Sequence, residues 1–89
     1  MKITGVSISK EIEKKLNTKH NVQEWEVKEV FFNTEASLLV RKSQSKYAAY
    51  GCTYAGRYLL VGFKILKDGI VEVRTARDMT AGERKLYRR

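Results

Sequence analysis

The amino-terminal third of the chain has its apolar residues at helical spacing. Residues 8–16 place an isoleucine or leucine at every fourth position, which predicts a helix capped by Ser9 and running to about residue 17. A polar break follows over 17–21. Residues 22–32 then predict a second helix that is apolar on two sides and therefore well buried. Ahead of these helices, residues 2–8 favour a short edge strand.

The middle of the chain changes to short strand-like segments. Apolar runs separated by short polar connections predict four strands, over residues 38–40, 47–54, 58–66 and 70–76. Short connections of this kind are typical of an antiparallel meander. Asp68 and Gly69 predict a two-residue hairpin turn in which both residues have positive φ. In the last strand, Val71, Val73 and Thr75 are expected to face the core.

The carboxy-terminal segment carries the signature of a helix start. Thr80 and Glu83 form a capping box, in which each side chain accepts a hydrogen bond from the other residue's backbone N–H. The helix that follows places Arg84 and Arg88 on one face. The expected fold is α+β, in a single domain over residues 1–89. It consists of a four-stranded antiparallel meander sheet with two amino-terminal helices and one carboxy-terminal helix packed on one face.

Charge is the first indication of a partner. The 89 residues include 18 Lys and Arg against 10 Asp and Glu, a net charge of +8. Residues 46–89 hold 10 of these bases and 4 of the acids, or +6, and most of the arginines. Because a guanidinium group presents a planar fork of donors that fits phosphate, this half of the chain predicts binding to nucleic acid. A solubilising surface or a docking face for an acidic protein fits the same charge.

The composition argues against several other classes of protein. One histidine and one cysteine, with no cluster at metal-ligand spacing, predict no metal and no cofactor. The glycines match no nucleotide-binding loop. The longest apolar run, over 58–63, is too short to cross a bilayer, and the single Cys52 excludes an intramolecular disulfide. We therefore expect a soluble, cytoplasmic protein without membrane association.

The last twenty residues contain Thr75-Ala-Arg77, followed by Glu83-Arg84 and Tyr87. This order resembles the carboxy-terminal signature of BrnT-type toxins, in which a strand ending in Ser/Thr-Ala-Arg leads into a helix with Glu-Arg and a following Tyr. Further similarity lies at Lys19-His20-Asn21-Val22, Glu29-Val30-Phe31, Gly51 and Gly56-Arg57, so the resemblance covers residues 8–88. The chain departs from the family pattern at Asn33-Thr34, where Asp-Pro is usual, and at Lys46, where an arginine is usual.

The resemblance implies a RelE-like bacterial toxin of a type II toxin–antitoxin system. Such proteins are small basic ribonucleases that an antitoxin holds inactive. The implied partner is a BrnA-like DNA-binding antitoxin, with a heterotetramer built from two toxins on an antitoxin dimer. The implied reaction is metal-independent cleavage of RNA through attack by the 2′-hydroxyl, with arginines stabilising the phosphate.

Nine side chains are candidates for this chemistry. The catalytic candidates are Arg77, Arg84, Glu83, Tyr87 and His20, and the RNA-binding candidates are Arg57, Arg74, Lys85 and Arg88. His20 is the only residue of a type that exchanges protons near neutral pH.

Each main candidate also has a structural interpretation. Arg77 can bridge the last strand and helix, and Glu83 can act only as a cap. Tyr87 can pack its ring on the sheet or stack on a base. His20 lies between two helices and can have a surface or structural role.

Three functions fit these observations. The first is a ribonuclease toxin. The second is a non-catalytic RelE-like basic domain that binds an antitoxin or nucleic acid. The third is an interaction domain that docks an acidic protein.

Overall fold

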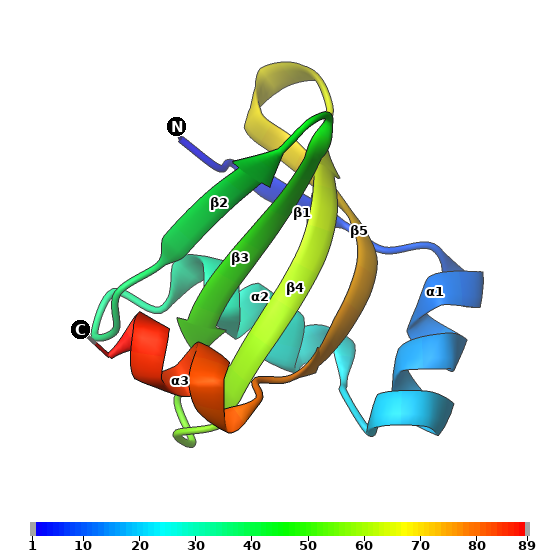
Figure 1. Cartoon of the computed structure of the whole chain (residues 1–89). Coiled ribbons are helices and arrows are strands. Elements are labelled where there is room, and N and C mark those ends of the chain that lie inside the picture. The colour runs from blue at the N-terminus through cyan, green and yellow to red at the C-terminus, as the bar shows by residue number, and fades with distance from the viewer. Residues whose placement is uncertain (1, 89) are drawn as a thin grey trace.

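The computed structural model of the chain describes residues 2–88, whose strands form one five-stranded sheet in the order β1-β5-β4-β3-β2 (Figure 1). The predicted antiparallel meander is present, as β2 (Leu39–Ser43), β3 (Lys46–Cys52), β4 (Tyr58–Ile65) and β5 (Ile70–Asp78). β1 (Gly5–Ser7) adds to β5 in parallel. The prediction of four antiparallel strands is therefore wrong at this edge. The short edge strand expected over residues 2–8 is nevertheless confirmed as β1, whose Val6 pairs with Val71 and packs against the core.

The first amino-terminal helix begins as predicted but ends differently, whereas the second begins at Glu24, later than predicted, and ends at the predicted residue, Phe32. The Ser9 hydroxyl accepts a hydrogen bond from the Ile12 N–H and caps α1 (Lys10–Lys15). The chain then continues as a π-helical turn, η1 (Leu16–His20), so the predicted break over 17–21 is wrong. The wider turn ends at Asn21, whose φ is 50°, and leads to α2 (Glu24–Phe32).

The helices lie on both faces of the sheet, not on one as predicted. Figure 1 shows α2 behind the sheet and α3 (Ala81–Tyr87) in front of one end of it. α2 lies so close to β3 that a Cβ on Gly51 would come within 2.7 Å of the Val30 side chain. The face of the sheet opposite α2 is called the open face below.

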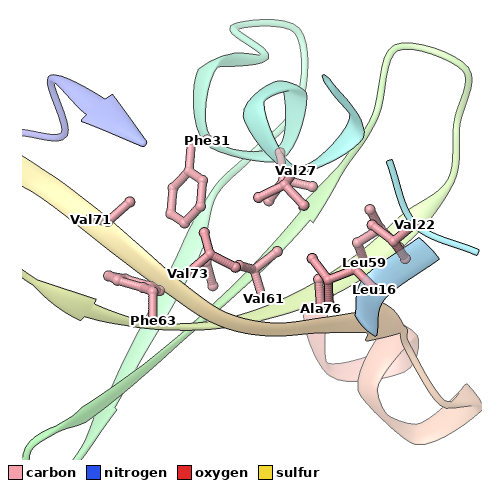
Figure 2. Close-up of a cluster of buried hydrophobic side chains, with 12 residues drawn as sticks. Leu16, Val22, Val27, Phe31, Leu59, Val61, Phe63, Val71, Val73 and Ala76 are labelled. Carbon is pink, nitrogen blue, oxygen red and sulfur yellow. The ribbon is translucent and has the colours of Figure 1, made fainter. Parts of the chain in front are cut away.

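The core fills the space between α2 and the sheet. Figure 2 shows Val27 and Phe31 of α2 directed toward side chains of β4 and β5. The ring of Phe31 meets Phe63 edge-on, at 5.2 Å between centroids. The expectation that α2 is buried on two sides is wrong, since Trp25 is 56% exposed.

A bulge changes the register of β5. The pairing of β4 with β5 shifts between Gly62 and Phe63, so that Val73 and then Ala76 face the core. Thr75, predicted to be inside, is exposed on the open face because the extra residue reverses the alternation.

The connection from β4 to β5 has the predicted backbone. Asp68 has a φ of 61° and Gly69 a φ of 78°, although the turn extends over a 3-10 segment, η2 (Lys67–Gly69). Within residues 2–88, no helix is long and apolar enough to span a membrane.

Candidate nucleic-acid interface

Rows of side chains cross the open face. The pairing of the strands places these side chains in two neighbouring rows. The first row contains Leu39, Tyr50, Leu60 and Arg77. The second row contains Arg41, Ala48, Gly62 and Thr75. The second row is low in the middle because alanine and glycine project little above the sheet. α3 lies in front of only one end of the open face (Figure 1), where the Tyr87 ring meets Tyr58.

Arg77 lies in the first row and is held there by Glu83. Its two terminal nitrogens donate to the two carboxylate oxygens of Glu83 at 2.8 and 2.9 Å, and one of them also donates to the Asp78 carbonyl at 3.0 Å. The side chain of Arg77 remains 38% exposed. Arg77 therefore bridges the strand and α3 while presenting part of its guanidinium to the open face.

Glu83 has two structural tasks. The predicted capping box is confirmed: the Thr80 N–H donates to the Glu83 carboxylate at 2.9 Å, and the Glu83 N–H donates to the Thr80 hydroxyl at 3.2 Å. These contacts, above all those from Arg77, lower the pKa of Glu83 to about 2. The carboxylate is therefore ionised at neutral pH and accepts protons weakly.

Tyr87 fixes the other end of α3. Its hydroxyl donates to the Ser37 carbonyl, and its ring meets Tyr58 edge-on at 5.9 Å between centroids. Burial raises the pKa of Tyr87. The side chain thus packs on the sheet, with its hydroxyl bound inside the protein.

Arg57 sits at the same end of the sheet, toward α2. It donates to the carboxylate of Asp78 at 2.7 and 3.1 Å and to that of Glu26 at 3.1 and 3.2 Å. It also donates to the carbonyls of Asn21 and His20 at 2.8 and 3.0 Å. The hydrogen bond to Asp78 is the main cause that raises the pKa of Arg57. These contacts use all five donors of a guanidinium, so a contact with RNA requires one of them to break.

His20 and Arg84 gather near the same carboxylate. The pKa of Asp78 is lowered mainly by the hydrogen bond from Arg57, and the charges of His20 and Arg84 lower it further. Arg57, Asp78 and Arg84 line a cavity of about 360 Å³. Of the five predicted catalytic residues, Arg77 and Glu83 are thus in direct contact, His20 and Arg84 each act on Asp78, and Tyr87 packs against Tyr58. Asp78 could not be singled out from sequence, because an aspartate just before a helix is also expected as a partner of the helix dipole.

The other predicted RNA contacts are exposed and dispersed. Arg74, which the bulge leaves without a pairing residue on β4, donates to Glu72 at 3.1 Å. Lys85 is exposed on α3, and Arg88, exposed at the C-cap of that helix, lines a cavity of about 310 Å³. In the described part of the chain, no three His, Cys, Asp or Glu side chains gather as ligands for a metal ion.

Three residues of the open face lie outside the predicted set. Arg41, Lys46 and Tyr50 line a cavity of about 390 Å³ beside the β2–β3 hairpin. Arg41 and Lys46 are exposed and form no ion pair with another residue of the range 2–88. The alternation of Lys46, Ala48 and Tyr50 along β3 is the signal that places them on one face.

A solved structure has the same fold. The 1.1 Å crystal structure of the Brucella abortus ribonuclease toxin BrnT matches 86% of this chain and 97% of that chain, with a TM-score of 0.66 and 14% sequence identity. This likeness confirms the BrnT-like fold that the carboxy-terminal motif predicted. No protein-family model matches the sequence, and no curated protein matches it.

Proposed function

We propose that this protein is a metal-independent endoribonuclease toxin whose RNA substrate lies across the open face. The observation that carries the proposal is the placement of Arg41, Lys46 and Arg77 on the one sheet face that α2 does not cover. Cations on a common face provide the electrostatic attraction that a polyphosphate chain needs. The likeness to a ribonuclease toxin supports RNA as the substrate.

The proposed reaction uses the RNA's own nucleophile. A ribose 2′-oxygen attacks the adjacent phosphorus, and the bond between phosphorus and the 5′-oxygen breaks. The 2′-hydroxyl loses its proton to a base, and the departing 5′-oxygen gains a proton from an acid. The products are a 2′,3′-cyclic phosphate and a free 5′-hydroxyl. Negative charge grows on the non-bridging oxygens, where donors fixed in advance stabilise it most.

The side chains divide this work. We assign phosphate stabilisation to the exposed part of Arg77, with Arg84 as the second cation. His20 is assigned to proton transfer, because an imidazole can accept and donate protons, and Arg57 joins the His20 carbonyl to the Asp78 carboxylate. Glu83 is assigned to positioning, because a carboxyl group with a pKa of about 2 is a poor base. Tyr87 likewise positions α3.

Incubation of purified, antitoxin-free protein with RNA in EDTA tests the proposal. We expect fragments that end in cyclic phosphate. Arg77→Lys retains a charge to pair with Glu83 but loses the forked donors, and should slow cleavage by about 10²–10³-fold. Lys14→Gln removes a charge from the remote helix α1 and should have no effect. Intact RNA at micromolar protein would contradict the proposal.

A non-catalytic nucleic-acid-binding or antitoxin-binding module is the second candidate. It is favoured by the pairing of Arg57 and Arg77 with carboxylates, which leaves both guanidinium groups partly neutralised. Binding to RNA that weakens steeply with salt, without any cleavage, would select this function.

The partner in this proposal is a BrnA-like DNA-binding antitoxin, assembled as a heterotetramer around an antitoxin dimer in the cytoplasm. Support comes from the likeness to a toxin. Co-expression with the neighbouring reading frame, followed by measurement of the mass of the purified complex, tests it. A protein that purifies alone and stays monomeric beside that frame's product would contradict it.

A further inference from the structure

We infer that the low second row of the open face is a nucleotide-binding subsite, in which a base stacks on Tyr50 while Arg41 and Lys46 hold the phosphates of a short single-stranded segment. This inference rests on the proposed function, because it concerns the part of the substrate next to the phosphate at Arg77. To the proposed contact between Arg77 and a phosphate, the inference adds a subsite that binds a base of the substrate.

The shape of the surface supports a groove at this position. Ala48 and Gly62 form its floor, and Gly62 lies so close to Thr75 that a Cβ there would come within 2.9 Å of the Thr75 methyl group. Two cavities of about 390 and 400 Å³ adjoin the floor, and Lys46 lines both. A side chain larger than the methyl group of Ala48 at that position would fill the space above the floor.

The charge of the groove is available to a ligand. Arg41, Lys46 and Lys64 are exposed and, among the described residues, form no ion pair, whereas Arg74 at the far wall pairs with Glu72. Neighbouring rows lie about 7 Å apart along the strands, and neighbouring strands lie about 4.8 Å apart. Arg77 on β5 and Arg41 on β2 are one row and three strands apart, or about 16 Å between backbones, a distance that a short single-stranded segment can span.

The aromatic wall favours an unpaired base. Tyr50 is half-buried, stands in the same row as Arg77, and borders the row of Ala48, which is the next residue on this face of β3. A tyrosine ring stacks on the flat face of a base. In a duplex, that face of the base is already stacked on the neighbouring bases. The subsite therefore requires a single-stranded segment.

Fluorescence anisotropy with a labelled single-stranded 2′-O-methyl hexanucleotide tests the subsite, because this probe binds but lacks the attacking hydroxyl. Arg41→Gln and Lys46→Gln should each reduce the slope of log affinity against log salt by about 0.7. Tyr50→Leu should weaken binding roughly five- to 150-fold. Ala48→Leu, which removes no charge, should weaken binding by filling the floor. Lys14→Gln should bind as the wild type does.

A labelled polyglutamate peptide separates base binding from simple attraction between charges. Tyr50→Leu should bind this peptide as tightly as the wild type does, and equal losses for both probes would overturn the inference. Unchanged hexanucleotide binding by all four groove variants, with unchanged circular dichroism, would also overturn it, even if RNA is cleaved. Conversely, weaker binding by these variants without RNA cleavage would support the subsite and count against the enzyme.

Discussion

Replacing Glu83 by glutamine tests how this carboxylate fixes Arg77 and α3 at the end of the sheet. The pKa of Glu83 is about 2, against an ordinary value of 4.5, chiefly because Arg77 donates to it. A lowered pKa means that the ionised group stabilises the folded protein. That stabilisation is complete above about pH 4.5 and is lost as the pH falls toward 2.

The loss of stability expected for Glu83→Gln follows from the lowered pKa of Glu83 and from the solvent exposure of Arg77. The difference between the two pKa values, 4.5 − 2 = 2.5, sets an upper limit of about 3 kcal/mol on what the ionised Glu83 contributes to the free energy of unfolding. Because Arg77 is 38% exposed, solvent screens the pair, and we expect Glu83→Gln to lower the free energy of unfolding by about 1–2 kcal/mol at neutral pH.

Urea unfolding followed by circular dichroism, repeated between about pH 2 and pH 7, measures this difference. The difference in the free energy of unfolding between wild type and Glu83→Gln should become smaller below about pH 4.5. Glu11→Gln is the control, since the Glu11 side chain is 81% exposed and its loss should change stability little. The reasoning would be refuted if the two proteins had the same free energy of unfolding at pH 7, or if they differed as much near pH 2 as at pH 7.

Three further substitutions test the packing by urea unfolding at neutral pH. Arg57→Met leaves Glu26, only 8% exposed, without its partner and should lower the free energy of unfolding by about 3 kcal/mol; a change under about 1 kcal/mol would contradict the ion-pair account. Gly51→Ala places a Cβ 2.7 Å from the Val30 side chain and 3.1 Å from its carbonyl oxygen, at an expected cost of about 1–3 kcal/mol; equal stability would show that α2 does not lie this close. Phe63→Ala empties the core of a side chain that is 2% exposed and should cost about 3–5 kcal/mol, whereas a loss typical of surface sites would argue against this core.

Local features of the fold were predictable because their partners lie close in the sequence. The capping box joins Thr80 and Glu83, which are three residues apart. The positive φ at Asp68 and Gly69 follows from residue types that tolerate it. The alternation of strands and short turns was likewise enough to predict the order β2 to β5.

Tertiary features were not predictable from the same patterns. Arg57 binds carboxylates 21 and 31 residues away, and nothing in the sequence distinguishes it from an arginine that faces solvent. The bulge after Gly62 moves Thr75 to the open face, although strict alternation places it in the core. Arg41 and Lys46 were missed as candidates because only the pairing of β2 with β3 brings them together.

Amide chemical shifts test the central claim most directly, namely that nucleic acid lies across the open face. The ¹⁵N-labelled protein would be titrated with the 2′-O-methyl hexanucleotide and its shift changes mapped onto the sheet. The account predicts changes concentrated at Arg41, Ala48, Tyr50, Gly62 and Arg77, with α1 unaffected. Changes centred on Trp25 and the outer surface of α2, or no changes at all, would contradict it.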